Sequence, residues 1–278
     1  MGNGKPMPNV RQQEMARRPG RATAIALGVL VWTAAAQAAD CPRKGTLGTS
    51  RVMAVDPAIW PRVGRRDFAQ TLPLGDHEVV LTFDDGPWPA TTPQVLRTLA
   101  NECVRATFFL IGKPASEFPD IVKATAAAGH SIGHHTWMHL SLRRMPYADA
   151  VEEIDQGIAA VEMAEHGIET TTPSTPFFRF PGFESTQATL DLLQSRGISV
   201  FSTDLLANDW VRMTPRQELH LLVKRLKLVN RGIVLLHDPQ PTTAAMLPAF
   251  LHYLRKHGYR VVHLVPANAA GEPEAGPH

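Results

Sequence analysis

The chain has 278 residues, of which 44% are hydrophobic, so it can bury a substantial core without relying on disulfides alone. Its 28 Lys and Arg residues nearly balance 26 Asp and Glu residues, and the formal net charge is only +2. Nucleic-acid-binding proteins usually carry a strong basic excess, so this balance argues against a nucleic-acid partner.

The N-terminus has the three-part order of a secretory signal. Arginines at residues 17–21 precede an apolar run over residues 22–36, and Ala36-Gln37-Ala38 supplies small residues for cleavage. The run is shorter than the ~20 residues that a membrane-spanning helix needs. We therefore expect residues 1–39 to be a cleaved signal peptide, with an uncleaved membrane anchor as the alternative. The mature protein would be periplasmic or secreted, without stable membrane insertion. Met15 stands just before the arginines, so the natural start and the export route stay open.

Two cysteines are present, Cys41 just after the predicted cleavage site and Cys103 well inside the regular part of the chain. In an oxidising compartment such a pair favours a disulfide. Loop-entropy arguments credit a link of this span with about 4 kcal/mol. Two lone cysteines make no metal site, and Asp40 directly before Cys41 disfavours a lipid anchor. We predict a structural Cys41–Cys103 disulfide.

Residues 40–73 show no sustained period and carry scattered Pro, Gly and Arg, so we expect an irregular segment that wraps the domain. After it, apolar runs rich in β-formers alternate with helical stretches. The sequence predicts strands at Glu78–Phe83, Ala106–Ile111, Ser131–Gly133, Phe177–Phe180, Ile198–Ser202, Ile233–Leu236 and Arg260–Val265. It predicts helices at Thr92–Glu102, Ala115–Ala128, Tyr147–His166, Thr186–Ser195, Pro215–Leu228 and Thr243–Lys256.

This alternation predicts parallel strands joined by helical crossovers, either in a barrel or in an open doubly wound sheet. Several strands are apolar enough to be covered on both faces. We expect a single α/β domain over residues 74–266, followed by a flexible tail at residues 267–278 that is rich in Ala, Gly and Pro.

Polar residues follow the ends of the apolar runs, which form the active edge of parallel α/β folds. The first run ends in Asp84-Asp85-Gly86-Pro87 rather than in a glycine-rich phosphate loop, so a nucleotide site is disfavoured. Two adjacent ionised carboxylates repel each other unless they have separate roles, and a cation bound by one of them would offset this repulsion. The same four residues also suit an ordinary turn. Alone they do not decide between the two interpretations.

The third run leads into His134-His135-Thr136-Trp137-Met138-His139. Residues four apart share a face of a helical turn, so we expect His135 and His139 to reach one cation. Two histidines and a carboxylate form a common metal-ligand set that leaves room for water and substrate. A chance pair of surface histidines is the alternative, but an aspartate at a neighbouring strand end favours a metal. We expect His134 to point away from the site.

Arg179 lies in the fourth, apolar run, where an unpaired charge would be costly. We expect it to be buried and paired with whichever of Asp84 and Asp85 does not bind the cation, with a surface arginine packed on aromatic rings as the alternative. Asp209-Trp210 follows the fifth run, and Trp210 alone would be taken as core. The sixth run ends in His237-Asp238, and a histidine held by a carboxylate is the arrangement of a proton donor. A capped loop histidine is the alternative there.

Together these residues resemble the five ordered motifs of the polysaccharide deacetylases, carbohydrate esterase family 4, which includes the chitooligosaccharide deacetylases. The matching motifs are Thr82-Phe83-Asp84-Asp85-Gly86, His135-Thr136-x-x-His139, Arg179-x-Pro181, Asp209-Trp210 and Leu235-x-His237. The resemblance runs from about Val79 to His237 and is far more specific than any single motif. It implies the family fold, a distorted (β/α)7 barrel similar to a TIM barrel.

The resemblance also implies a metal centre and a sugar pocket. A divalent metal, most often Zn, with Co, Ni or Mn as alternatives, would be held by Asp85, His135 and His139. The pocket for the sugar and the acetyl methyl group would be formed by Pro181, Gly182, Phe183, Trp210 and Leu235.

Four further roles carried over from the family concern proton transfer. Asp84 would be the general base, and Arg179 would keep it ionised. His237 would protonate the leaving amine, and Asp209 would orient that imidazole. These roles imply hydrolysis of an acetyl amide.

Two features depart from the family pattern. Gly182 precedes Phe183 here, whereas the family usually has an aromatic residue and then glycine. A backbone N–H at Gly182 can still serve as an oxyanion donor. Asp204 and Asp209 are five residues apart rather than three, which leaves the role of Asp204 open.

The implied function is removal of N-acetyl groups from an N-acetylglucosamine-type glycan. Chito-oligosaccharide, peptidoglycan and exopolysaccharide all fit, and the sequence does not separate them. One alternative is a deacetylase of O-acetyl esters or other small amides on the same fold. Another is a catalytically silent glycan-binding protein of the cell envelope, which would be expected to lack the base or the acid. Asp84 and His237 are both present. The sequence leaves the oligomeric state open.

Overall fold

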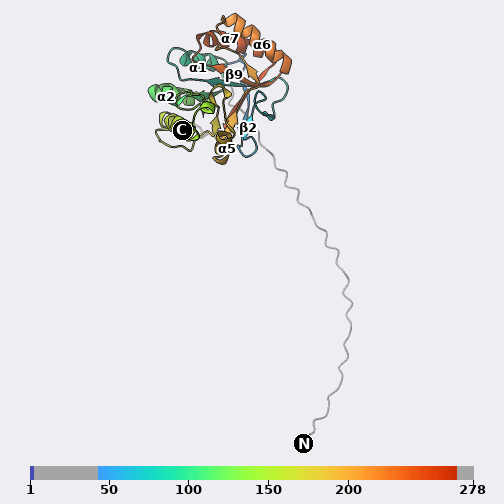
Figure 1. Cartoon of the computed structure of the whole chain (residues 1–278). Helices are drawn as coiled ribbons and strands as arrows, with labels where there is room; N and C mark the ends of the chain where they lie inside the picture. Colours follow the sequence, from blue (N-terminus) through green and yellow to red (C-terminus); the bar gives the residue numbers. More distant parts are fainter. Residues whose placement is uncertain (3–42, 268–278) are drawn as a thin grey trace, which may run out of the picture. The chain divides into compact units, whose positions relative to one another are not determined.

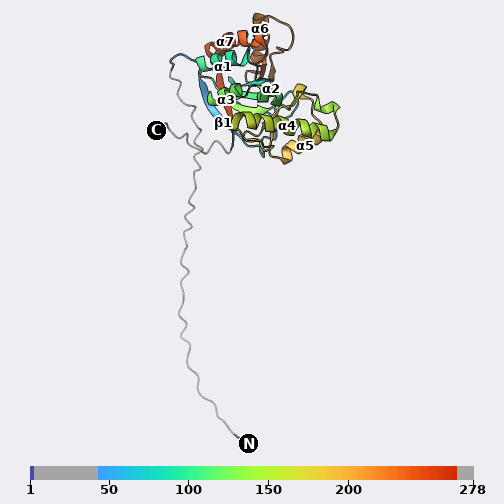
Figure 2. The ribbon, with the colours of Figure 1, turned by 90° about the vertical axis from the view of Figure 1, so that its left-hand side faces the viewer.

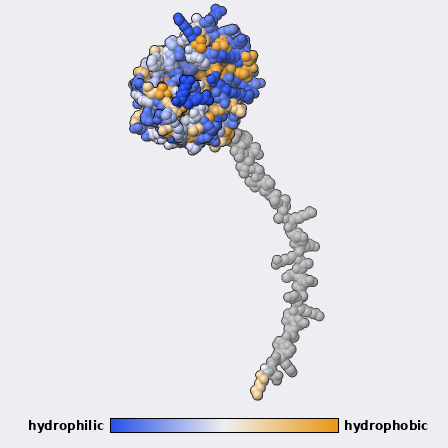
Figure 3. All heavy atoms as spheres, viewed as in Figure 1, coloured by the Kyte–Doolittle hydropathy of each residue, from blue (hydrophilic) through white to orange (hydrophobic). Residues whose placement is uncertain are grey.

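The computed structural model describes residues 1–2 and 43–267. The predicted signal peptide beyond its first two residues, Cys41 and residues 268–278 of the predicted tail lie outside the described residues. No helix in the described part of the chain is both long and apolar enough to cross a membrane. The face drawn in Figure 3 mixes hydrophilic and hydrophobic residues without one dominant apolar patch.

The described part of the chain alternates strands with helices (Figure 1). The strands are β1 (Thr49–Val55), β2 (Arg62–Val63), β3 (Glu78–Asp84), β4 (Thr107–Leu110), β5 (Ser131–His134), β6 (Phe177–Phe178), β7 (Ser199–Phe201), β8 (Leu205–Leu206), β9 (Gly232–His237) and β10 (Arg260–Pro266). The α-helices are α1 (Thr92–Asn101), α2 (Gly112–Glu117), α3 (Pro119–Ala127), α4 (Tyr147–His166), α5 (Gln187–Ser195), α6 (Pro215–Val229) and α7 (Pro241–Lys256). Two short 3₁₀ turns are η1 (Leu142–Arg144) and η2 (Pro181–Phe183).

The strands form a barrel-like circuit of parallel pairs that is interrupted between β7 and β8, which do not pair with each other. β3, β4, β5, β6 and β7 pair in succession, and after β7 the chain enters β8 almost at once. β8 pairs with β9, and β9 pairs back onto β3 over six residue pairs. The expected α/β barrel is confirmed, and it is distorted because its strands range from two residues in β6 to seven in β3.

β1 and β2 extend this circuit at both ends of the strand path. β1, the blue strand in Figure 2, pairs with β10, which in turn pairs with β3. β2 pairs with β7. The prediction that residues 40–73 are irregular is therefore wrong for these two strands. β2 has only two residues, and in β1 only Met53 and Val55 are buried, so neither strand carries a clear apolar period.

The helices cover the barrel in two groups (Figure 1). α7 packs against both α1 and α6, while α4 contacts α2, α3 and α5. One predicted helix, Ala115–Ala128, is in fact two, because Phe118 precedes Pro119 and adopts a non-helical conformation with φ −129° and ψ 54°. α6 begins as its sequence predicts, with the Thr214 side chain accepting a hydrogen bond from the Gln217 backbone N–H at 3.3 Å.

β3 is buried along its whole length, and its side chains alternate between two environments. Val79, Leu81 and Phe83 belong to the core beneath the helices. Val80 belongs instead to a second apolar cluster that draws on β1, β4, β6, β7, β9 and β10. By this alternation Asp84 points to the same inner side of the barrel as Val80, and Asp85 follows the end of the strand.

Candidate functional site

The carboxyl ends of β3, β5 and β9, with the loops that follow them, surround a pocket of about 300 Å³. This is the edge of a parallel barrel at which ligand sites form. The residues that line the pocket are Arg66, Asp84, Asp85, His135, His139, Phe180, Gly182, Phe183, Trp210, Leu235, His237 and Gln240.

Three of these side chains could hold one metal ion. The ligand atoms of Asp85, His135 and His139 all lie within 4.8 Å of one another. Asp85 Oδ1 is 3.3 Å from His135 Nε2 and 3.2 Å from His139 Nε2. That oxygen is buried and has no hydrogen-bond partner, as expected of an atom that is to bind a cation. His135 Nδ1 lies 2.6 Å from the Arg179 carbonyl, so it donates there and leaves the Nε2 lone pair facing Asp85. The chemistry of these three groups fits a divalent metal such as zinc.

The two histidines do not lie on a helix, so the helical-turn prediction is wrong. The chain leaves β5 and turns through left-handed conformations at Thr136, with φ 65°, and at His139, with φ 59°. The imidazole rings still come together, with centroids 5.0 Å apart. Their proximity comes from this turn rather than from helical periodicity.

Helix α4 supports the turn that carries the histidines. The Trp137 and Met138 backbone N–H groups donate to the Glu153 carbonyl and to its Oε2, both at 2.9 Å. Gly157 lies so close to Thr136 that a Cβ there would be 2.7 Å from the Thr136 carbonyl oxygen. The turn that carries His135 and His139 is thus positioned by direct contact with a helix.

Asp84 and Arg179 form a buried ion pair, as the sequence predicts. Arg179 Nη1 lies 2.7 Å from Asp84 Oδ1, and the arginine side chain has no exposed surface. Its remaining donors reach Thr82 Oγ1 and the Phe201 and Ser202 carbonyls, so the buried guanidinium is well supplied with acceptors. Asp84 Oδ2 remains 3.9 Å from His135 Nε2, beside the metal ligands.

His237 faces the pocket from the end of β9. Its Nδ1 and its backbone N–H each lie 2.7 Å from an oxygen of Asp209. Burial alone would lower the pKa of His237, but the hydrogen bond and charge of Asp209, with Asp84 and Asp85 nearby, raise that pKa to about 9. Its Nε2 lies 4.0 Å from Asp85 Oδ2, so the imidazolium is directed into the pocket.

The electrostatics of Asp85 suit a ligand that stays ionised. Burial would raise its pKa, but the nearby imidazoles of His135, His237 and His139 hold that pKa below its usual range. Gly86 follows it, and a side chain there would run into the buried Asp238 carboxyl. Only glycine therefore fits the turn after the two aspartates.

The other predicted site residues divide into two groups. Gly182, Phe183, Trp210 and Leu235 line the pocket, whereas Pro181 is buried and is not among the lining residues. Trp210 is 52% exposed and meets the His237 ring edge-on, with centroids 5.6 Å apart.

His134 and Asp204 lie away from the pocket lining. His134 is buried, 3.6 Å from Glu162, so it points away from the site as expected. Asp204 accepts hydrogen bonds from the Arg65 and Ile233 backbone N–H groups and the Thr71 hydroxyl, at 2.8–2.9 Å. It therefore ties the segment before β3 to β9.

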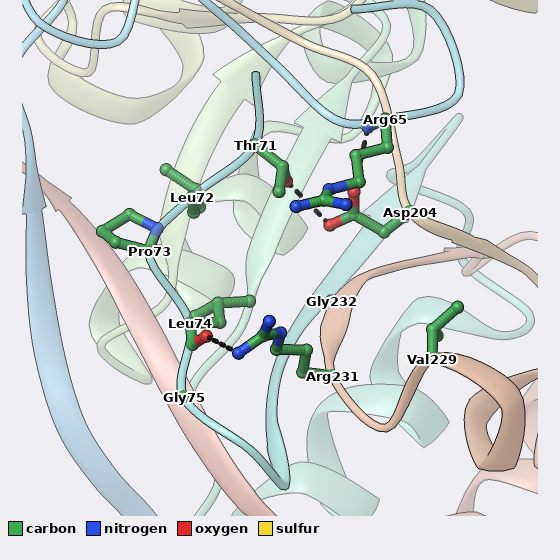
Figure 4. A pocket seen from close by; sticks show the side chains of 10 residues that line it. All are labelled: Arg65, Thr71, Leu72, Pro73, Leu74, Gly75, Asp204, Val229, Arg231 and Gly232. Carbon is green, nitrogen blue, oxygen red and sulfur yellow. Dashed lines mark hydrogen bonds between the residues drawn. The ribbon is translucent and has the colours of Figure 1, made fainter. Parts of the chain in front are cut away.

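Asp204 also borders a larger cavity, of about 670 Å³ (Figure 4). In Figure 4 the Thr71 side chain bonds to Asp204, and Arg231 donates to the Leu74 carbonyl at 3.1 Å. The one carboxylate of this cavity is fully occupied by hydrogen bonds. The smaller pocket at the strand ends holds the candidate metal ligands and several titratable groups, so we place the candidate site there despite its smaller volume.

Sequence reasoning missed three lining residues, Phe180, Arg66 and Gln240. Phe180 is the unassigned position of the Arg179-x-Pro181 motif. Arg66 comes from the segment between β2 and β3, and its guanidinium lies 4.6 Å above the Phe183 ring. Its backbone N–H donates to the Thr203 carbonyl at 2.9 Å, which fixes the segment over the pocket. No local motif marks Arg66 or Gln240, because both reach the site only through the fold.

Comparisons with known proteins agree with this geometry. Residues 72–201 match the sequence profile of the family described as polysaccharide deacetylase. The match ends before Asp209 and His237, so the placement of those two residues rests on the structure.

Among curated relatives, the chain is 31% identical over 186 residues to the peptidoglycan-N-acetylglucosamine deacetylase of Listeria monocytogenes. That match covers 66% of this chain and 37% of the relative, so the chain spans little more than a third of that protein. It is 30% identical over 178 residues to the chitooligosaccharide deacetylase of Sinorhizobium fredii, covering 63% of this chain and 80% of the relative. Among solved structures, a peptidoglycan deacetylase of Bdellovibrio bacteriovorus superposes with a TM-score of 0.70 at 29% identity, over 87% of this chain and 65% of that one.

Proposed function

Because this chain belongs to the polysaccharide deacetylase family, we propose that it is a metal-dependent hydrolase that removes N-acetyl groups from N-acetylglucosamine-type glycans. One observation carries the proposal. A single pocket brings together three metal-binding groups, a buried aspartate beside them and an opposing imidazole held by its own carboxylate. These are the parts that amide hydrolysis needs.

Asp85, His135 and His139 would hold the metal. A divalent cation bound there, most often Zn in this family, would act as a Lewis acid toward the acetyl carbonyl and lower the pKa of an attacking water. The carboxylate of Asp85 is kept ionised by its imidazole neighbours, and His135 offers Nε2 because its Nδ1 proton is engaged by a carbonyl.

Asp84 is the proposed general base. Arg179 occupies Oδ1, while Oδ2 stays beside the metal ligands, where it can accept a proton from the attacking water. Because Arg179 is fixed by three further hydrogen bonds, it holds Asp84 in one orientation. The same buried charge favours the ionised form of the aspartate, which a base requires.

His237 is the proposed acid. Its raised pKa keeps the imidazole protonated at neutral pH, and Asp209 directs Nε2 toward the pocket. When the C–N bond breaks, the Nε2 proton passes to the departing amine, so acetate and a free amino sugar leave. Trp210 and Phe183 border this space and offer apolar faces on which a sugar ring can pack.

Acetate release from N-acetylglucosamine oligomers tests the proposal, with wild type compared with Asp84→Asn. We expect a chelator to abolish turnover of the wild type and added Zn²⁺ to restore it. Asp84→Asn should lose at least about 100-fold in kcat, because it removes the base. Asp191→Asn, at an exposed carboxylate of α5 that pairs with Arg62, is the matched control and should keep wild-type turnover.

Two results would overturn this mechanism. Full activity of Asp84→Asn would show that the base lies elsewhere, and activity after complete metal removal would exclude the metal-dependent route. Acetylated xylan, tested in parallel, separates N-deacetylation from release of O-acetyl esters.

We further propose that the protein is exported and carries the Cys41–Cys103 disulfide. The arginine cluster and the apolar run before residue 39 support export. We expect secreted or periplasmic protein to begin near residue 40 by N-terminal sequencing. Non-reducing peptide mapping should join the peptides of Cys41 and Cys103, and two free thiols in that material would contradict the disulfide.

A further inference from the structure

Two buried polar side chains stand behind the proposed acid, out of reach of the pocket. Thr243 of α7 and Glu218 of α6 both have no exposed surface. The Thr243 hydroxyl lies 2.8 Å from Asp209 Oδ2 and 2.9 Å from Glu218 Oε1. A continuous hydrogen-bonded chain thus runs from Glu218 through Thr243 and Asp209 to His237.

This hydrogen-bonded chain has too few hydrogen-bond donors if the carboxyl groups of Glu218 and Asp209 are both ionised. A threonine hydroxyl has one proton to donate, and an ionised carboxylate can only accept. Thr243 can therefore satisfy one of its two carboxyl neighbours but not both. Its oxygen would then face the other carboxylate lone pair to lone pair, which is unfavourable in a buried site. One carboxyl group must carry a proton.

The surroundings show which of the two carries it. Asp209 already accepts two N–H bonds from His237, one at each oxygen, so it suits the ionised state. Glu218 Oε1 meets only the Thr243 hydroxyl, and its Oε2 is buried without a hydrogen-bond partner. Burial and the negative charge of Asp209 raise the pKa of Glu218 to about 7, which agrees with a neutral acid.

We propose that Glu218 is a protonated positioning residue, which donates to Thr243 and so directs the Thr243 hydroxyl toward Asp209. The inference rests on the proposed function, because it concerns the acid of that reaction. With the hydroxyl so oriented, Asp209 is held by three donors at once and keeps the His237 ring aimed into the pocket. Neither Glu218 nor Thr243 touches the pocket, so they act through Asp209.

Substitutions that each change one hydrogen bond test the role of this hydrogen-bonded chain. Thr243→Val keeps the shape and removes the hydroxyl, and we expect kcat to fall about tenfold with KM changed less than twofold. Such a fall corresponds to about 1.4 kcal/mol of transition-state stabilisation. Thr243→Ser restores the hydroxyl and should recover most of the lost kcat. Glu218→Gln, whose neutral amide can donate to Thr243, should keep at least about a third of kcat, whereas Glu218→Leu should lose as much as Thr243→Val.

Leu226→Ala, in the buried face of α6, is the control for loosening of that helix. It should lower the melting temperature and leave kcat unchanged. If Thr243→Val behaves in the same way, the two residues are merely structural and the inference fails.

Infrared spectroscopy detects the protonation state of Glu218 independently of the activity assay. The carbonyl band of a protonated carboxylic acid at pH 6 should lose intensity in Glu218→Gln relative to wild type. The difference between the two proteins is needed because burial also raises the pKa of Asp238, to about 7. An unchanged band would overturn the proposal. If the wild type released no acetate from any glycan, the proposed function would fail, while this spectrum would still decide the state of Glu218.

Discussion

Asp84 and Asp85 are adjacent in the chain, yet their carboxylates lie in different surroundings. The alternation along β3 turns Asp84 to the inner side of the barrel and onto Arg179, while Asp85 follows the strand end among the imidazoles. Each carboxylate therefore meets its own positive partners, which reduces the repulsion that neighbouring like charges would suffer. Two neighbouring residues can thus serve as a base and as a metal ligand.

The buried ion pair gives a prediction about stability. Arg179→Leu should lower the free energy of unfolding by about 3–5 kcal/mol, because it leaves the Asp84 carboxylate buried without its partner. Urea denaturation measures the change. The control is Arg62→Leu, which breaks the exposed pair of Arg62 with Asp191 and should cost no more than about 1 kcal/mol. Equal costs for the two variants would show that burial of the pair does not matter.

For single residues, the sequence predicts which side chains form the candidate site better than it predicts the backbone conformation that brings them together. Residue types and their order identify the metal ligands, the buried arginine and the histidine–aspartate pair. The left-handed turn that brings His139 to His135 has no such signal, because it begins at Thr136, and a β-branched residue rarely adopts positive φ. Arg66 was missed for a different reason, since only the fold carries it to the pocket.

At the scale of elements, helix α4 and the metal-binding turn are in direct contact. Gly157→Ala should normally raise helix stability by about 1 kcal/mol, since alanine is the better helix former. Here we expect the opposite. A Cβ at this position would lie 2.7 Å from the Thr136 carbonyl oxygen, so the variant should melt earlier and bind Zn²⁺ more weakly.

Thermal melting and competition with a chromogenic chelator measure these two effects. Glu152→Ala, at an exposed position of the same helix, is the control and should change neither. A Gly157→Ala variant that is more stable than wild type and binds metal equally well would contradict the role given to this contact.

Long elements could be predicted from the sequence, whereas two of the shortest, β2 and β8, could not. The predicted bounds of α4 match the structure, because a helix of twenty residues is long enough for its apolar periodicity to be recognised. β2 and β8 have two residues each, too few for any period. They form because neighbouring strands supply their partners, which is tertiary information.

For the whole molecule, buried histidines predict a dependence of stability on pH. Burial and the nearby Arg105 lower the pKa of His130 to about 4 and that of His263 to about 3. An unfolded chain protonates these groups near pH 6.5. Between about pH 6.5 and 4 the unfolded state therefore binds more protons than the folded state, so stability falls as the pH is lowered.

Urea midpoints at pH 7.5 and 5.5 measure this loss, with chelator present throughout so that release of metal does not contribute. His263→Gln cannot take up a proton and should show a smaller loss between the two pH values. His220→Gln serves as the control, because His220 is exposed in the folded protein and should leave the loss unchanged. If His263→Gln and His220→Gln both lose as much stability as wild type between pH 7.5 and 5.5, protonation of His263 does not cause the loss.

The family match begins at residue 72, but the strands that border β10 and β7 come earlier in the chain. A protein engineer who started the chain at residue 72, where the match begins, would remove β1 and β2 together. The backbone N–H and C=O groups of β10 and β7 would then be left without their partners, ready to pair with another molecule. A shortened version that stays monodisperse should therefore be cut before Thr49, well outside the region that carries the recognisable motifs.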